Sequence, residues 1–442
     1  MKKHIAWFIT ITMMIASLAG CTSKAVETNA GSITDAGETT RAAVTETTIK
    51  AATEPVTIKW GIYETDNLSA DYYATIIDAF EKDNPGIKVE PVVATGDDRG
   101  TFWQTMYASG SFPDVVIEAE NLAMTEGFFA EVPDELLANF DPSTLCTYKG
   151  KTITIPAMKQ LRMQCYYNLA EFEALGLKEP KTWDEFLNIC DAIKTTGKTA
   201  LICGGAGDIW ATGQPWWISV TNQSLLTSYP KFNEDILAGK VKWNNETTID
   251  SLTKWQDMVK AGYYHKGCMS FSYSQAAAEF QNGGAVMMID GSWAAASFDA
   301  TGNNDFGVFA VPNPDGVNSY CASVSYWGVS ENSENKEAAF KFVEYVLGGN
   351  QDIYKFFLTA DGLSSVTKTP VTYEQGPLMN KFVSNWSDST LVPEILAVPG
   401  EYAMYNGFDG YLSKSLQNIF TGSDVTSELI SWDKEFEMLA ES

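Results

Sequence analysis

The sequence predicts an α/β protein. From residue 56 onward, short apolar segments typical of buried strands alternate with amphipathic segments of helical period, and this alternation is typical of sheets that helices cover on both faces. The chain has 442 residues, which is enough for about two or three domains with their own buried cores. Apolar residues make up 45% and charged residues 19% of the chain, as expected of a soluble globular protein.

The first elements follow the tract that ends at residue 55. Residues 56–60 (VTIKW) form a predicted strand, and Ser69 is placed to cap the helix that follows. The i, i+3, i+4, i+7 spacing gives this helix one apolar face, formed by Tyr73, Ile76, Ile77 and Phe80. The Asn-Pro-Gly sequence at 84–86 ends it, and residues 87–93 and 115–117 form further predicted strands.

The later elements have clearer boundaries. Thr182 and Glu185 have the spacing of a capping box and open a predicted helix that Gly197 ends. Buried strands are then predicted at 199–203 and 285–289, and the apolar spacing predicts helices around 249–259 and 339–346. The last forty residues are also helical in pattern.

The N-terminus predicts export and lipid attachment. Lys2 and Lys3 precede an apolar stretch from residue 5 to 19, which is too short to span a membrane and is typical of a secretory signal. The Leu-Ala-Gly-Cys sequence that ends at Cys21 resembles the bacterial lipoprotein cleavage box. We therefore predict a signal peptide at 1–20, a lipidated Cys21 that carries acyl chains such as palmitate, and a disordered Thr- and Ala-rich tether at 21–55.

Charge and cysteine content exclude several functions. The net charge of −26 would repel a phosphate backbone, so no nucleic-acid partner is expected, and any membrane attachment must come from the lipid. The six remaining cysteines show no CxxC motif and are expected to be mostly buried free thiols. His265 is the only histidine after residue 20, and it belongs to no HExxH motif. We therefore expect no metal and no cofactor.

The order of motifs resembles the extracytoplasmic sugar-binding proteins of ABC importers, family 1 solute-binding proteins whose class includes maltose-binding protein. The stretches that carry the resemblance include NPGIKV at 84–89, GLKEPKTWDEF at 176–186 and MMIDGSW at 287–293. The resemblance implies a two-lobed, type II periplasmic-binding-protein-like fold with three hinge crossings. One lobe would hold 56–164 and 329–373, and the other 165–328 and 374–442.

Most candidate ligand-binding residues follow predicted strands, because ligands of parallel α/β sheets lie beyond the carboxyl ends of the strands, whereas Arg162, Trp327 and Tyr405 are candidates from their places in the layout that the resemblance implies. Trp293 is the leading candidate as an aromatic platform, and Asp290 would either accept hydroxyl protons or cap the next helix. Arg162 could clamp ring hydroxyl groups or pair with Glu118, and Trp327 could be either a platform or a packing residue. The remaining candidates are Trp210, Asp208, Asn121, Tyr63, Glu64 and Tyr405.

The predicted function is the binding of a solute, with no chemical reaction. The resemblance implies a monomeric receptor, anchored to the extracytoplasmic face of the cell membrane, that binds a carbohydrate, closes about its hinge and delivers the sugar to the permease of an ABC transporter. One alternative is a surface glycoside hydrolase, which would need two carboxyl groups about 5 to 9.5 Å apart. A binding protein for a polyamine or a peptide is a further alternative.

Overall fold

The structure is a computed structural model that describes residues 55–95, 99–122, 127–302, 304–316, 319–386 and 389–441, apart from the side chain of Asn121. The predicted signal peptide (1–20), Cys21 and the tether up to residue 54 lie outside these ranges. Within the described ranges, no helix combines the length and apolar character that crossing a membrane requires.

A six-stranded mixed sheet forms the first half of the fold. In the order β10-β9-β3-β1-β2, β1 pairs in parallel with both β2 and β3, while β3 is antiparallel to β9. β4 also pairs antiparallel with β9. The strands are β1 (Val56–Ile62), β2 (Ile87–Val93), β3 (Val115–Val116), β4 (Ile155–Leu161), β9 (Ser319–Val329) and β10 (Thr390–Pro393).

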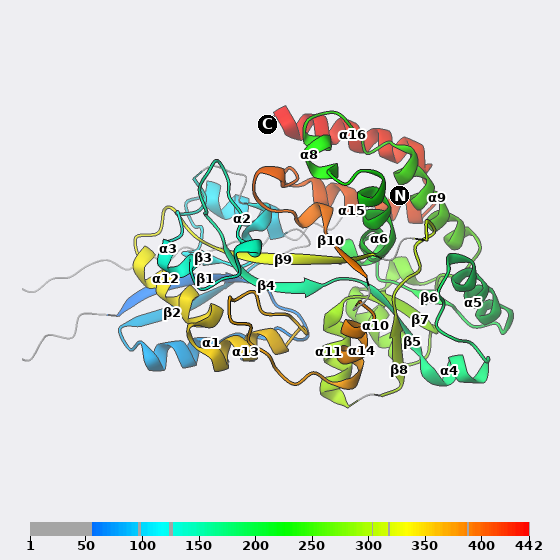
Figure 1. Ribbon diagram of the computed structural model, residues 1–442, viewed down its shortest axis with the longest axis horizontal. Helices are drawn as coiled ribbons and strands as arrows, with labels where there is room; N and C mark the ends of the chain where they lie inside the picture. The colour runs from blue at the N-terminus through cyan, green and yellow to red at the C-terminus, as the bar shows by residue number, and fades with distance from the viewer. Residues whose placement is uncertain are drawn as a thin grey trace, which may run out of the picture. The chain divides into compact units, whose positions relative to one another are not determined.

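The core of this half forms because apolar side chains of β1 meet apolar helix faces. Ile58 and Trp60 are fully buried, and the Trp60 ring packs edge-on against Tyr73 and Phe342. Both partners belong to helices that lie beside the sheet in Figure 1. We call this set of buried residues, drawn from 58–158 and 327–366, the first core. Its helices are α1 (Ala70–Asp83), α12 (Lys336–Glu344) and α13 (Gln351–Thr359), with α2 (Arg99–Ala108) and α3 (Asp134–Leu137) in the same part of the chain.

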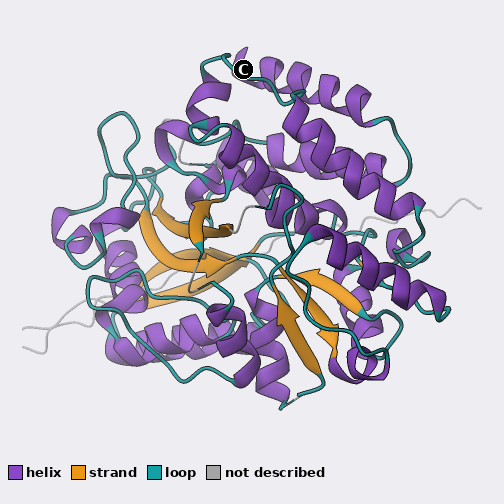
Figure 2. Cartoon of the chain, turned by 45° about the vertical axis from the view of Figure 1, so that its right-hand side comes forward, coloured by secondary structure: helices purple, strands orange, loops and turns teal. Residues whose placement is uncertain are grey.

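A four-stranded sheet forms the other half. Its order is β6-β7-β5-β8, with β5 antiparallel to both β7 and β8 and β6 parallel to β7. Figure 2 shows the strands as two groups with helices around them. The buried residues of this half, from 161–322 and 378–436, are here called the second core. The strands are β5 (Gln164–Asn168), β6 (Leu201–Ile202), β7 (Met287–Asp290) and β8 (Phe306–Phe309).

Most helices belong to the second core. Their apolar faces explain its size, because α9, α15 and α16 pack against one another and α15 also packs against α6. The set comprises α4 (Leu169–Ala174), α5 (Trp183–Thr195), α6 (Trp210–Trp216), α7 (Asn222–Ser228), α8 (Phe232–Leu237), α9 (Glu246–Lys260), α10 (Tyr273–Gln281), α11 (Ser292–Thr301), α14 (Pro377–Ser384), α15 (Phe408–Phe420) and α16 (Val425–Glu441).

Strand β9 contributes to both cores. Cys321 and Ala322, near its start, belong to the second core, whereas Trp327 and Val329, near its end, belong to the first. The chain leaves the first sheet after β4 and enters the second at β5, and between these two strands the Arg162 backbone N–H donates to the Cys321 carbonyl at 3.0 Å. The residue boundaries of the two predicted lobes stay a prediction.

The structure confirms the predicted helix caps, which depend only on residues close together in the sequence. The Ser69 hydroxyl accepts a hydrogen bond from the Tyr72 N–H at the start of α1, and Thr182 and Glu185 form the predicted capping box of α5. The two later predicted strands differ in their ends, since β6 covers only Leu201–Ile202 and β7 runs to Asp290. The six described cysteines are free and, except for the half-buried Cys146, fully buried. This confirms the expectation of buried thiols.

Candidate functional site

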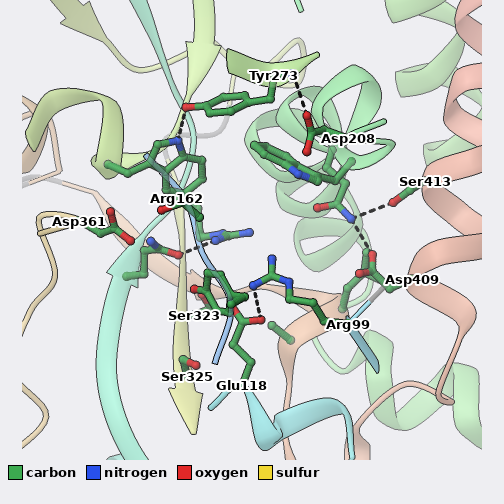
Figure 3. Close-up of a pocket in the computed structure, with 18 of the residues that line it drawn as sticks. Arg99, Glu118, Arg162, Asp208, Tyr273, Ser323, Ser325, Asp361, Asp409 and Ser413 are labelled. Carbon is green, nitrogen blue, oxygen red and sulfur yellow. Dashed lines mark hydrogen bonds and ion pairs between the residues drawn. The ribbon is translucent and has the colours of Figure 1, made fainter. Parts of the chain in front are cut away.

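A cavity of about 740 Å³ is lined by residues from both halves of the fold. Tyr63, which packs on the first core, lines it together with Trp293, which packs on the second. Two small residues of β9, Ser323 and Ser325, also line it. Figure 3 shows Arg99 at the bottom of the view and Tyr273 at the top. A ligand of this cavity would therefore touch both parts of the protein.

Three aromatic rings form one wall of the cavity. The Trp210 ring lies 5.0 Å from the Tyr273 ring and 6.0 Å from the Trp293 ring, centroid to centroid, and meets Trp293 nearly edge-on at 82°. We call these three residues the aromatic wall. All three lie at the starts of helices, in α6, α10 and α11. Flat, half-buried rings of this kind offer a surface on which an apolar ring face can stack.

Two glycines allow the aromatic wall to form. A Cβ atom on Gly291 would lie 2.2 Å from the Trp293 ring, and a Cβ atom on Gly204 would lie 2.9 Å from the Tyr273 backbone nitrogen. Both distances are too short for any side chain larger than hydrogen. Gly291 therefore lets the indole fold back over the end of β7, and Gly204 lets α10 begin beside the end of β6.

A chain of hydrogen bonds fixes the wall from behind. The Trp293 Nε1–H donates to the Tyr273 hydroxyl oxygen at 2.7 Å, and the Tyr273 O–H donates to Asp290 Oδ2 at 2.9 Å. The Tyr273 backbone N–H donates to Asp208 Oδ2 at 2.9 Å. Asp290 caps no helix, because Gly291 is the N-cap residue of α11 and no side chain caps it. Of the two predicted roles for Asp290, helix capping is therefore wrong.

Burial controls the ionisation of Asp290. The side chain is only 2% exposed, and loss of water raises the pKa of its carboxyl to about 7. Hydrogen bonds from the Gly291 backbone and from Tyr273, together with the charge of Arg162, oppose this rise without cancelling it. Asp290 therefore changes its charge near neutral pH.

An ion pair stands on the opposite wall. Arg99 Nη1 lies 2.6 Å from Glu118 Oε2, and the Arg99 guanidinium lies over the Tyr63 ring at 3.8 Å from its centroid. Burial alone would lower the pKa of Arg99, but the carboxylate of Glu118 raises it above the ordinary value. One face of the Tyr63 ring is therefore covered by Arg99 and is closed to a ligand.

Glu118 has a backbone conformation that is rare for its residue type. Its φ of 56° and ψ of 48° are left-handed, two residues after the end of β3, and this region costs a non-glycine residue about 1–2 kcal/mol. Strain of this kind is found at functional sites more often than elsewhere. The conformation belongs to a carboxylate that lines the cavity and pairs with Arg99.

Two further carboxyl groups on this side are hard to ionise. Burial, together with the charge of Glu118, raises the pKa of Glu120 to about 8, although its carboxylate accepts a hydrogen bond from the Tyr326 N–H at 3.0 Å. Burial also raises the pKa of Asp361 to about 6, while the Asn67 side chain donates to it at 2.9 Å. Each of these carboxyl groups can accept hydrogen bonds and, when it is protonated, can also donate one.

Arg162 has a different partner from the predicted one. Its Nε lies 2.8 Å from Glu394 Oε2, and its Nη1 donates to Gln160 Oε1 at 2.6 Å. The alternative pairing with Glu118 is wrong, because Glu118 is held by Arg99. The Arg162 guanidinium also lies 5.7 Å from the centre of the Trp293 ring. Arg162 thus lies beside the Trp293 ring in the cavity lining, in the segment between β4 and β5.

Most predicted candidates line the cavity. Trp327 does not, because it is only 1% exposed and packs on Trp60 and Phe357 in the first core. Trp327 is therefore a packing residue. The alternative role as a ligand platform is wrong, because a buried ring has no face that a ligand can reach. The side chain of Asn121 and all of Cys21 lie outside the described part of the chain. The candidates in the cavity lining are Trp293, Asp290, Trp210, Asp208, Glu118, Tyr63, Glu64, Arg162 and Tyr405.

Three of the cavity residues that sequence reasoning missed carry much of the site's geometry. Arg99, Tyr273 and Asp361 all line the cavity. Tyr273 directly follows Ser272, whose capping box with Gln275 opens α10, so a helix start could have been found there. Arg99 and Asp361 follow no predicted strand, and only the tertiary fold brings them beside Glu118 and Asn67.

The cavity lining combines aromatic rings with side chains that form hydrogen bonds. Aromatic faces and side chains that donate or accept hydrogen bonds suit a ligand that has both apolar faces and hydroxyl groups. Among the residues that the structure describes, no group of three or more His, Cys, Asp or Glu side chains is arranged to hold a metal ion.

The fold and the cavity together define a class of receptor. A family model described as "Bacterial extracellular solute-binding protein" matches residues 66–348, which is more than half of the chain, and the protein belongs to this family. Solved structures of similar fold include a chitin oligosaccharide binding protein (TM-score 0.75, 21% identity, 88% of this chain and 100% of that one) and maltose-bound MalE3 of T. maritima (TM-score 0.69, 20% identity, 87% and 100%). The predicted two-lobed fold is confirmed.

Among individual relatives, the chain is 28% identical over 285 residues to a multiple sugar-binding protein of Streptococcus mutans, across 61% of this chain and 66% of that protein. The alignment thus spans slightly less than two thirds of that relative's length. The chain is also similar to the solute-binding protein RafE in complex with raffinose (TM-score 0.68, 21% identity, 87% of this chain and 100% of that one).

The pKa of Asp290 predicts a pH dependence of stability. An unfolded aspartate has a pKa of about 3.9, so between about pH 4 and 7 the folded protein keeps a proton that the unfolded chain has lost. Stability therefore falls as pH rises through this window. We expect Asp290→Asn to reduce this loss by up to about 3 kcal/mol between pH 4.5 and 7.5, as measured by urea unfolding at these two pH values.

The exposed Asp78 provides the control. Asp78→Asn should follow the wild type across the same pH range, because it removes an exposed carboxyl group that does not line the cavity. If the Asp290→Asn curve ran parallel to the wild type, the raised pKa of Asp290 would be wrong.

Proposed function

We propose that this protein captures a carbohydrate, in particular an oligosaccharide, in the cavity and delivers it to the permease of an ABC transporter. One observation carries the proposal: a cavity of about 740 Å³ has an aromatic wall on one side and a wall of hydrogen-bonding carboxyl groups on the other. Trp210, Tyr273 and Trp293 supply aromatic rings, while Glu120 and Asp361 supply hydrogen-bonding carboxyl groups.

A sugar suits these two walls for a simple physical reason. A pyranose ring has an apolar C–H face that stacks on an aromatic ring, and its rim carries hydroxyl groups that both donate and accept hydrogen bonds. Solved structures of similar fold support this choice, because they are described as binding chitin oligosaccharide or as complexes with raffinose, stachyose or maltose. A volume of about 740 Å³ lies within the range of small-molecule binding sites and has room for more than one sugar ring.

Closure would follow from contacts with both cores. A sugar that touches Trp293 and Asp361 together stabilises the conformation in which they are near each other, and so shifts the hinge equilibrium. A shift from 99:1 open to 1:99 requires about 5.5 kcal/mol of differential binding. Stacking on two rings and several hydrogen bonds to charged groups can supply this amount. In this proposal the lobes are 56–164 with 329–373, and 165–328 with 374–442.

Delivery would require the receptor to stay near its transporter. Cys21 lies in the lipoprotein-like cleavage box, and residues 22–55 carry no aromatic residue. We propose that a lipid on Cys21 anchors the protein to the extracytoplasmic face of the membrane and that this tract is a flexible tether. A monomer is sufficient for this role, and no bond is made or broken in it.

A screen of defined sugars tests the proposal. Raffinose, maltotriose, N,N′,N″-triacetylchitotriose and trigalacturonic acid are each added to the purified protein, and the unfolding temperature is measured. A ligand at 100 times its Kd should add about 2.7 kcal/mol of stability. The same incubations are assayed for newly released reducing sugar. Stabilisation without release supports a binding protein, release supports a hydrolase, and no stabilisation by any probe contradicts carbohydrate capture.

Trp293→Ala is expected to weaken sugar binding at least tenfold, because it removes one face of the aromatic wall. Calorimetry with the sugar found in the screen measures the change. The control is Trp386→Ala, which removes an indole that packs on Tyr320 and Phe382 but does not line the cavity. Unchanged affinity in the Trp293 variant, or an equal loss in both variants, would remove Trp293 from the binding site.

Cys21→Ala is expected to release the protein from membranes, since the thiol is the proposed site of acylation. Fractionation of expressing cells, followed by immunoblotting, measures the distribution. Cys146→Ala keeps Cys21 and should stay with the membrane fraction. If the Cys21 variant also stayed there, the lipid anchor would have to be abandoned.

A further inference from the structure

We infer that the cavity selects saccharides without acidic groups, because each of its two guanidinium groups is already neutralised by a carboxylate of the protein. This inference rests on the proposed carbohydrate capture and adds the charge class of the sugar. Arg99 and Arg162 are the two basic residues among the described residues that line the cavity. Recognition of a carboxylate, sulfate or phosphate on a sugar normally requires such a group to be available.

Arg99 is occupied on two sides. Its Nη1 is 2.6 Å from the Glu118 carboxylate, and its planar group lies 3.8 Å above the Tyr63 ring. Figure 3 shows this pair with the dashed contact between them. The two side chains are 38% and 31% exposed, so the pair can be reached from the cavity. A ligand therefore meets a charge-neutral pair in place of a free cation.

Arg162 is occupied more completely. Nε and Nη2 both face the Glu394 carboxylate, at 2.8 and 3.3 Å, and Nη1 donates to Gln160 at 2.6 Å. Nη1 and Nη2 thus each donate a hydrogen bond, whereas Nε contacts Glu394 as an ion pair without a hydrogen bond. Its side chain is 17% exposed and that of Glu394 only 5%. A buried pair of this kind is costly to separate, because either charge alone would remain without water.

Outside the two ion pairs, the described part of the lining holds acidic side chains and no further basic one. A carboxylate on a ligand would therefore meet charges of its own sign, and such contacts are strongly unfavourable. Neutral hydroxyl groups meet no such penalty, because carboxylates accept their hydrogen bonds. The acidic residues in the lining outside the two ion pairs are Glu64, Asp66, Asp208 and Asp409, together with Glu120, Asp290 and Asp361, whose raised pKa makes them harder to ionise.

The test compares matched neutral and acidic sugars. Raffinose and maltotriose are each oxidised at their primary hydroxyl groups to carboxylates, and calorimetry measures the Kd of both forms with the wild-type protein. Trigalacturonic acid is a further acidic probe. For each sugar that binds, we expect the oxidised form to bind at least 100-fold more weakly. This comparison needs no variant and does not depend on the folding of one.

Glu118→Gln then tests the cause. It removes the negative partner of Arg99 and keeps the size of the side chain, so the guanidinium can meet a ligand carboxylate. We expect the ratio of acidic to neutral affinity to rise at least tenfold. Glu64→Gln is the matched control, since Glu64 also lines the cavity and the change removes the same charge without releasing an arginine. In that variant the ratio should rise less than in Glu118→Gln, because one repelling charge is removed but no guanidinium is released.

The outcomes separate the inference from the proposed function. Equal or tighter binding of an oxidised sugar, or binding of trigalacturonic acid alone, would overturn the inference while carbohydrate capture stands. Absence of binding by every neutral and acidic probe would overturn both. Equal shifts in the two glutamine variants would refute the role of the Arg99–Glu118 pair.

Discussion

The fold depends on one strand that serves two hydrophobic cores. β9 buries Cys321 in the second core and Trp327 in the first, and it pairs with β3, β4 and β10. Between these buried ends the strand presents Ser323 and Ser325 to the cavity. Small polar side chains at these positions leave the space that larger ones would fill. The constraint on β9 therefore positions the two walls of the cavity.

The two walls differ in how they are held in place. The aromatic wall is fixed by a hydrogen-bond chain from Trp293 through Tyr273 to the buried Asp290. The opposite wall is fixed by charge, through the Arg99–Glu118 pair and the left-handed backbone at Glu118. Both arrangements orient side chains before any ligand arrives, and this preorganisation lowers the entropy that binding must overcome. The cavity is thus built for recognition by shape and hydrogen bonding.

The features that could be predicted from the sequence are those that depend on neighbouring residues. The capping box of Thr182 required only neighbouring residues, and the position of Trp293 required only the end of a buried strand. Arg99 and Tyr273 could not be found in this way, because their roles come from partners 19 and 17 residues away in the sequence. The two alternatives for Trp327 could be separated only by its burial on Trp60, which depends on packing between distant segments.

A crystal structure of the protein with a bound oligosaccharide tests the central claim most directly. The account predicts that a sugar ring stacks on the aromatic wall, while its hydroxyl groups bond to carboxyl groups of the opposite wall, such as Asp361. One ligand would then contact both cores at once. A sugar bound to one core alone, or bound outside the cavity, would contradict the account.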